Sequence, residues 1–293
     1  MAKLEEVLAK VDASLKRLAK IPVILKRFRQ AVLTAACSGR LTADWREERG
    51  IGEGEELPEG WNWILLDDVL PKGGIFDGPF GSNLKSSDYT DTGVQVIRLE
   101  NVGHLRFNFE KETFVSLQKY ETLRRHTVGG NDIIFASFIS EEVRACLLPK
   151  LATKSIAKAD CFCLRPNNNI DRQYLVYQLV TQESYNHLVE QIHGVTRPRI
   201  NTTQLRKLPV RFCSLPEQQE IVRRVESFFS LSDQLETRYI KAKTHIDKLT
   251  QSILSKAFRG ELVPQDPNDE PASVLLERIR SQEKPIASVR RNK

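Results

Sequence analysis

Apolar residues recur at alternating steps of four and three along the last third of the chain. The eleven positions of this stripe, nine of them apolar, are Ile221, Val225, Phe228, Ser232, Leu235, Tyr239, Ala242, Ile246, Leu249, Ile253 and Lys256. No proline or glycine lies between Glu217 and Phe258. The period predicts a coiled-coil helix over residues 216–258, about 65 Å long, with Gly260 as its C-terminal stop. A helix of that length needs a partner helix to bury its apolar stripe.

A second amphipathic pattern of the same period covers residues 2–38. Pro22 is expected to kink or interrupt this helix, because its ring displaces a backbone hydrogen bond. Residues 26–41 align without gaps on residues 247–262, with five identities in sixteen positions. One of these identities pairs Gly39 with Gly260. Two copies of one helical element therefore bracket the rest of the chain.

The region between the two helices has the composition of a globular domain. Short strand-like runs occupy residues 93–99, 132–137 and 160–164, and helical spacing occurs at residues 117–123 and 171–191. Interleaved strands and helices predict an α/β domain. The predicted organisation is an N-terminal helix (1–50), a Gly/Glu/Pro linker (51–60), the α/β domain (61–214), a C-terminal helix (215–260) and a tail with a short helix (261–293).

Charge and cysteine content narrow the class of protein. The formal net charge is +6, and residues 191–216 and 143–159 carry basic side chains without any acid, a distribution that permits binding to a polyanion. Five cysteines without a CxxC pair predict reduced thiols packed as small apolar residues, and no zinc site. No run approaches 18 apolar residues, so we expect a cytoplasmic protein without a membrane span or secretory signal.

The sequence lacks the motifs by which several common classes of enzyme are identified. No glycine precedes a lysine, which excludes a Walker-type phosphate loop. No lysine has Asp or Glu two residues before it, so the Asp/Glu-x-Lys pair of metal-dependent nucleases is missing, and the histidines form no HExxH. No Asn/Asp-Pro-Pro-aromatic segment of amino-methyltransferases occurs. We therefore expect a protein that is not an enzyme.

Six segments of the central region and the C-terminal helix form a distinctive set. They are Gly78–Tyr89 (GPFGSNLKSSDY), Gly93–Val102 (GVQVIRLENV), Gly130–Phe135 (GNDIIF), Ile200–Pro209 (INTTQLRKLP), Leu215–Ile221 (LPEQQEI) and Phe258–Pro264 (FRGELVP). In this order the chain resembles the specificity (S) subunit of type I DNA restriction–modification systems. The resemblance implies a non-catalytic subunit that recognises double-stranded DNA through a target recognition domain, here residues 61–214.

The same resemblance assigns cofactors to partner subunits. Two modification methyltransferase subunits would bring S-adenosylmethionine for adenine methylation, and a restriction/translocase subunit would bring ATP and Mg for translocation and cleavage. This chain itself is expected to hold no cofactor and no metal. The runner-up reading is a coiled-coil scaffold whose central domain binds protein rather than DNA.

Typical members of the family carry two target recognition domains, whereas this chain has one. It therefore resembles a half-length form that reads half of a bipartite target. The two long helices are expected to form an antiparallel coiled-coil stalk, which is also the expected docking surface for the methyltransferase subunits. Alternatively, two chains associate through their stalks as a homodimer, which would rebuild the two-domain layout and predict an interrupted palindromic target.

DNA recognition requires cations and amides on phosphates and planar polar groups on base edges. Four segments supply such groups: the loop after residue 194, the loop at residues 78–89, the end of the strand at residue 98, and the loop after residue 136. The candidate DNA-binding residues are Gly81, Ser82, Asn83, Lys85, Ser86, Arg98, Asn101, Ser137, Arg144, Thr196, Arg197, Arg199, Asn201 and Thr202. Phe80, in the second segment, is expected to pack in the core instead of stacking on a base.

Overall fold

A computed structural model describes residues 2–192, 198–264, 268 and 270–282 of the chain. The chain divides into two compact units. One consists of Met1–Val23 together with Leu235–Lys293, and the other of Ile24–Gln234. The long C-terminal helix contributes to both units.

The helices near the two ends of the chain match the apolar periodicity. Helix α8 covers Leu215–Phe258, 44 residues, and Gly260 follows it with a left-handed φ of 73°. The N-terminal pattern gives two helices, α1 (Ala2–Leu18) and α2 (Ile21–Cys37), so the predicted interruption near Pro22 is confirmed. Pro22 lies in the first turn of α2, where its missing N–H removes no helical hydrogen bond.

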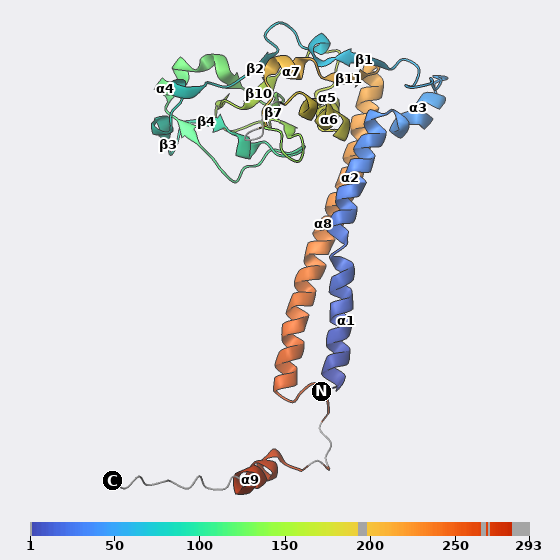
Figure 1. Ribbon diagram of the computed structural model, residues 1–293, viewed down its shortest axis with the longest axis vertical. Helices are drawn as coiled ribbons and strands as arrows, with labels where there is room; N and C mark the ends of the chain where they lie inside the picture. Colours follow the sequence, from blue (N-terminus) through green and yellow to red (C-terminus); the bar gives the residue numbers. More distant parts are fainter. Residues whose placement is uncertain (1, 193–197, 265–267, 269, 283–293) are drawn as a thin grey trace. The chain divides into compact units, whose positions relative to one another are not determined.

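Within the unit Ile24–Gln234, α2 lies along the first part of α8 (Figure 1). The rings of Phe28 and Phe228 meet edge to face with their centroids 6.1 Å apart. The Arg29 guanidinium lies 2.7 Å from an Asp233 carboxylate oxygen. Beyond the end of α2, the Leu41 carbonyl accepts a 2.8 Å hydrogen bond from Arg224, which comes earlier in α8 than Phe228 and Asp233. The two segments therefore run antiparallel (Figure 1).

The other unit contains α1, the second part of α8 and the short helix α9 (Ala272–Gln282). Val11 of α1 and Ile253 of α8 are buried there. Other positions of the α8 stripe, among them Leu235 and Leu249, are more than 40% exposed. Burial along α8 therefore follows the predicted stripe only in part.

The described residues of the central region form three sheets and four short α-helices (Figure 1). Strand order is β1–β11 in the first sheet, β2–β10–β7–β8 in the second and β3–β5–β4–β9–β6 in the third, and β4 and β9 run parallel whereas the other described pairs are antiparallel. The strands are β1 (Asn62–Leu65), β2 (Ile75–Phe76), β3 (Tyr89–Thr90), β4 (Val94–Ile97), β5 (Phe114–Val115), β6 (Thr127–Val128), β7 (Ile133–Ala136), β8 (Ala145–Leu147), β9 (Ser155–Ala157), β10 (Cys161–Leu164) and β11 (Pro209–Phe212). The helices are α4 (Leu117–Thr122), α5 (Arg172–Leu179), α6 (Gln182–Glu190) and α7 (Thr202–Arg206).

The predicted strands at 93–99, 132–137 and 160–164 coincide with β4, β7 and β10. The helical pattern at 171–191 is divided into α5 and α6, because Thr181 caps a new helix by accepting a hydrogen bond from the Ser184 N–H. The mixture of strands and helices agrees with the expected domain class. One large core joins the β2–β10–β7–β8 sheet to α2 and the start of α8, since Phe135, Phe162 and Val225 belong to the same cluster.

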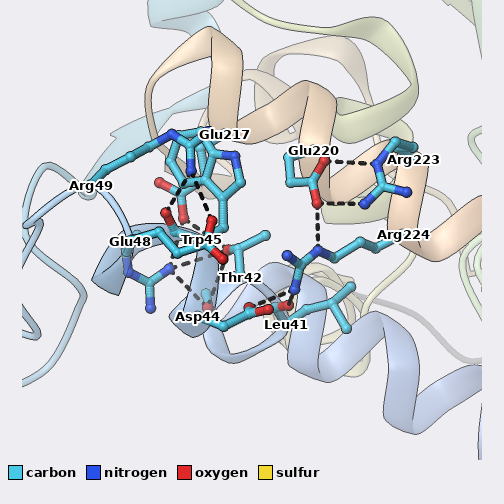
Figure 2. A network of polar contacts seen from close by, with 12 residues as sticks. Leu41, Thr42, Asp44, Trp45, Glu48, Arg49, Glu217, Glu220, Arg223 and Arg224 are labelled. Carbon is cyan, nitrogen blue, oxygen red and sulfur yellow. Dashed lines mark hydrogen bonds and ion pairs between the residues drawn. The ribbon is translucent and has the colours of Figure 1, made fainter.

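A buried carboxylate fixes the junction between these helices and the sheets. Helix α3 (Ala43–Glu47) contributes Arg46, which is 1% exposed and donates a 2.7 Å hydrogen bond to Glu217 at the start of α8. Thr42 and Trp61 donate to the same carboxylate at 2.8 and 3.0 Å. Figure 2 labels Glu217 and Thr42 of this network beside a more exposed one in which Arg224 links Glu220 to the residues that follow α2.

All five cysteines are free and buried, as the sequence analysis expects. Burial raises the pKa of the Cys37 and Cys146 thiols to about 12. Both thiols therefore stay protonated at neutral pH and pack as small apolar groups. Throughout the part of the chain that the structure describes, no helix has the length and apolar character that crossing a membrane would require.

We predict that Arg46→Met destabilises the fold by about 3–5 kcal/mol, because it leaves the Glu217 carboxylate buried without its cation. The free energy of unfolding from urea denaturation of the chain measures this loss. Adding Glu217→Gln to Arg46→Met should recover part of the stability, because the buried charge is removed. The recovery is partial, since Thr42 and Trp61 donate to different oxygens of Glu217 and the amide oxygen can accept from only one of them. Equal stability of the single and double variants would contradict this assignment.

Candidate nucleic-acid interface

The turn between β9 and β10, residues 158–160, is the point where several loops of the central region meet. Gly78 lies directly against it: a Cβ atom at Gly78 would be 2.0 Å from the carbonyl carbon of Lys158. No side chain fits in that space, so glycine is required for the approach. Asp160 adopts a left-handed φ of 75°, an uncommon conformation for a residue other than glycine.

Backbone hydrogen bonds attach two further loops to this turn. The Ser137 N–H, at the end of β7, donates to the Asp160 carbonyl at 2.9 Å. The Ile200 N–H donates to the Ser137 carbonyl at 3.1 Å, which places the segment after residue 197 beside the same loop. Arg199 Nη1 then lies 2.8 Å from Asp160 Oδ1. Residues separated by more than 120 positions are thus held within one short stretch of surface.

An aromatic ring brings two cations together beside the turn. The Lys158 ammonium donates a 2.7 Å hydrogen bond to the Tyr89 hydroxyl and lies 5.3 Å from the centre of the Tyr89 ring. The Arg98 guanidinium lies 5.7 Å from the same ring centre. Arg98 also pairs with Glu100 at 3.1 Å, whereas the hydrogen-bond partner of Lys158 here is a neutral phenol. Among the residues that the structure describes, Lys158 therefore has no acidic partner within ion-pair distance.

Asp77, next to Gly78, is a partly buried carboxyl in this group. Burial is the main cause that raises its pKa to about 6, and the nearby Asp160 carboxylate adds to the effect. Hydrogen bonds from the backbone N–H groups of Gly78 and Asp160, together with the Arg199 charge, oppose it. The Asp77 carbonyl is bonded to the His126 ring at 2.7 Å, and burial lowers the pKa of that imidazole. The carboxyl is consequently ionised at pH 7.5 and largely neutral at pH 5.

Many of the candidate residues lie around this turn with exposed side chains. Arg199 is exposed and Arg98 is half-buried. The loop that begins at Gly78 presents five exposed candidates: Gly81, Ser82, Asn83, Lys85 and Ser86. Arg144 is half-buried and donates hydrogen bonds to the carbonyls of Leu99 and Val102, which ties the start of β8 to the segment after β4. The structure thus brings these segments together as neighbours.

Other candidates have structural roles or lie elsewhere. Asn101 is 1% exposed, and its amide bonds the carbonyls of Asn108 and Lys111. Ser137 is 2% exposed. Asn201 caps α7 by accepting a hydrogen bond from the Gln204 N–H, with Thr202 as the first residue of that helix. Thr196 and Arg197 lie outside the described residues.

One prediction from the sequence is wrong, and three residues of the site were not predicted. Phe80, expected in the core, is 58% exposed. Asp77, Lys158 and Asp160 were not among the candidates, although Lys158 belongs to the acid-free segment 143–159. That absence of acids was the available signal for Lys158. Nothing comparable marks the two aspartates, because only the folded chain brings them beside Arg199. Among the residues that the structure describes, no group of three or more His, Cys, Asp or Glu side chains is arranged to hold a metal ion.

Comparison with known proteins identifies relatives along nearly the whole chain. The chain is 32% identical over 311 residues to the type I restriction enzyme EcoDI specificity subunit of Escherichia coli, an alignment that covers 96% of this chain and 65% of the relative. It is also 32% identical over 302 residues to the StySPI specificity subunit of Salmonella potsdam, covering 96% of this chain and 60% of the relative. The chain thus spans less than two thirds of the length of these relatives.

Solved structures show a similar fold. A chain from a structural study of complex assembly and conformational transition in the type I R-M system superposes with a TM-score of 0.58 and 19% identity, over 88% of this chain and 59% of that one. The HsdS subunit of Thermoanaerobacter tengcongensis gives a TM-score of 0.50 and 19% identity, over 89% of this chain and 59% of the subunit. At this level of identity the likeness concerns the fold alone.

A family model described as the type I restriction modification DNA specificity domain matches residues 58–243, which is more than half of the chain. This match covers the sheets, the turn at residues 158–160 and the first part of α8. The chain therefore belongs to the family of type I restriction–modification DNA specificity proteins.

Proposed function

We propose that this chain is the non-catalytic DNA-recognition subunit of a type I restriction–modification complex and reads one half of a bipartite target. The observation that carries the proposal is the convergence of loops near residues 78, 98, 137 and 199 on the turn at residues 158–160. These loops combine cations with small polar groups, as phosphate and base contacts require. Family membership indicates DNA as the polyanion.

Individual residues of this surface have different roles in the proposal. Lys158, Lys85 and Arg98 contact phosphates, while the exposed Ser82 and Asn83 hydrogen-bond the duplex from a loop that Gly78 holds close to the turn. Asn101 and Ser137 are buried and do not contact DNA themselves; they hold the segments after β4 and β7 in place. Arg144 acts in the same way through its bonds to the segment after β4.

The long helices complete the proposed subunit. We expect α1 and α2 to pair with α8 as an antiparallel coiled-coil stalk, for which the Phe28–Phe228 and Arg29–Asp233 contacts are the support within the unit Ile24–Gln234. The stalk docks the methyltransferase subunits, and the restriction/translocase subunit joins the complex. S-adenosylmethionine, ATP and Mg belong to those partners.

Exposed apolar residues on α8 support a symmetric dimer. Leu231, Leu235 and Leu249 are 50%, 42% and 44% exposed on the same broad face of the helix. A second copy of the chain that covers this face would bring two recognition domains to one duplex and imply an interrupted palindromic target.

We predict that Lys158→Ala weakens binding to duplex DNA of any sequence by a similar factor and reduces the slope of log affinity against log salt by about 0.9, as expected for one lost phosphate contact. Fluorescence anisotropy titrations of the assembled complex at several salt concentrations measure both quantities. Lys150→Ala is the matched control, because Lys150 is exposed at the other end of the β7–β8 pair. If Lys158→Ala leaves the slope of log affinity against log salt unchanged, or disrupts assembly with the partner subunits without weakening DNA binding, a protein-binding scaffold is favoured.

We predict that Asp77→Asn strengthens DNA binding at pH 7.5 and has no effect near pH 5. The wild-type carboxyl has a pKa of about 6, so it is charged and repels phosphate at the higher pH but is neutral at the lower one. Asp160 and Arg199, the charged groups beside it, are present in both proteins. The quantity to follow is the ratio of the variant's DNA affinity to that of the wild type at each pH. Titration of histidines and of partner subunits affects both proteins equally and cancels in this ratio. A ratio that does not change with pH would refute this assignment.

We predict a particle of twice the chain mass of 33.5 kDa at micromolar concentration. Light scattering coupled to size exclusion measures the mass, and Leu231→Glu should shift the dimer toward monomer by placing a charge on the shared face. Gln251→Glu, which adds the same charge at an exposed position on the opposite side of α8, is the control. A monomer at all concentrations would leave a single-chain stalk as the arrangement.

A further inference from the structure

Arg199 and Lys158 are neighbours on the proposed DNA surface but have opposite electrostatic surroundings. The Arg199 guanidinium lies 2.8 Å from the Asp160 carboxylate, and its charge acts on Asp77 as well. One cation is thus set against two carboxylates. Lys158, two residues before Asp160, hydrogen-bonds the neutral Tyr89 hydroxyl. This difference gives the two cations different tasks.

A phosphate is poorly suited to the position beside Arg199. At pH 7.5 the three side chains Arg199, Asp160 and Asp77 sum to a negative charge, which repels a phosphate oxyanion. A base edge carries no net charge, so the repulsion that it meets is much weaker. Arg199 is still 42% exposed, so its guanidinium remains accessible to a ligand while paired. An accessible guanidinium matches the O6 and N7 acceptors of guanine, the commonest specific arginine contact in the major groove.

The backbone around Arg199 is held in place before any ligand arrives. Hydrogen bonds on either side of it join the Ile139 N–H to the Pro198 carbonyl at 3.0 Å and the Ile200 N–H to the Ser137 carbonyl at 3.1 Å. Arg199 itself forms an isolated antiparallel bridge with Phe138.

The backbone of Asp160, the ion-pair partner of Arg199, is also held in place. The Asp160 carbonyl accepts from the Ser137 N–H at 2.9 Å, and its own N–H bonds the Asp77 carboxylate. Asp160 keeps a left-handed φ of 75°, a conformation that costs free energy and occurs preferentially at functional sites. An arginine held in one orientation loses less conformational entropy when it binds, which favours selective contact.

We propose that Arg199 reads a guanine of the target half-site, with Asp160 as the positioning residue that orients its guanidinium, while Lys158 binds the adjacent backbone phosphate. This inference rests on the proposed function, because it assigns separate tasks within the same DNA surface.

The test compares sequence selectivity and salt dependence in the same set of variants. The full chain, assembled with its methyltransferase subunits, selects duplexes from a library of randomised sequence, and the selected pool is sequenced. Arg199→Ala and Arg199→Lys should each lose the preference for one G·C pair by roughly 5- to 150-fold while preferences elsewhere in the half-site remain. Arg199→Lys keeps the charge but not the fork of donors, so its loss of selectivity separates base reading from simple charge.

The positioning role of Asp160 has its own variant. Asp160→Asn retains the backbone hydrogen bonds but weakens the hold on Arg199 and removes a negative charge. We expect a smaller loss of preference at the same G·C pair and a rise in affinity for unrelated DNA. Thermal unfolding of each assembled variant confirms that the fold is retained.

Lys158→Ala is the matched comparison, because it should lower the salt slope and leave every base preference intact. If Arg199→Ala lowers the affinity for all DNA sequences equally, with a reduced salt slope and unchanged base preferences, Arg199 contacts a phosphate. That result would overturn this inference but leave the proposed function standing. If neither Arg199→Ala nor Lys158→Ala alters selectivity, affinity or salt slope, this surface does not bind DNA, and the proposed function fails with it.

Discussion

The carboxylate of Glu217 accepts hydrogen bonds from three side chains that belong to two other parts of the chain. Arg46 and Thr42 follow α2, and Trp61 opens the central region at β1. Because Glu217 stands in the first turn of α8, one buried charge determines how the start of the long helix meets both the other helix and the sheets. The negative charge is favourable at a helix N-terminus and is neutralised by Arg46, so it can be buried at tolerable cost.

From this junction a continuous core extends into the central region. Val225 of α8, Ala36 of α2 and Phe135 of β7 belong to one cluster, so α2 and the first part of α8 are packed into the same interior as the β2–β10–β7–β8 sheet. Strand β7 leads out of that core directly to Ser137, whose backbone bonds reach Asp160 and Ile200. Loops that carry polar side chains are thereby supported by rigid strands. Such support suits a surface that must hold several contacts in fixed register with a duplex.

The sequence predicted local elements well and their long-range arrangement poorly. The strands β4, β7 and β10 follow from short apolar runs, and Pro22 and Gly260 mark the ends of helices, because each signal lies within a few residues of its consequence. The pairing of β1 with β11 joins residues about 150 positions apart and leaves no periodic trace in the sequence. The α8 stripe predicts a broad apolar face, but whether Ser232 or Leu235 is the buried member depends on which partner covers it.

The candidate surface shows the same division between local and long-range information. A basic, acid-free segment led to Arg199, and a position at the end of a predicted strand led to Arg98, whereas no local pattern marked the aspartates beside Arg199. A polar side chain is also not always available to a ligand. Asn101 could hydrogen-bond a base, but its amide N–H groups donate to two backbone carbonyls instead. Only the folded structure distinguishes a polar group that is exposed to solvent from one whose hydrogen bonds stabilise a loop.

The close approach of Gly78 to the Lys158–Ala159 peptide bears on attempts to redesign target preference. Grafting foreign side chains at the exposed positions between residues 79 and 88 leaves that approach untouched, so these positions are open to exchange between relatives. Leu84 is the exception, because it is buried in a core cluster with Val94 and Val115. Replacing the glycine itself would push the loop off the turn and disturb every neighbouring contact at once. A combinatorial library built on this scaffold should therefore vary the loop but keep its first residue invariant.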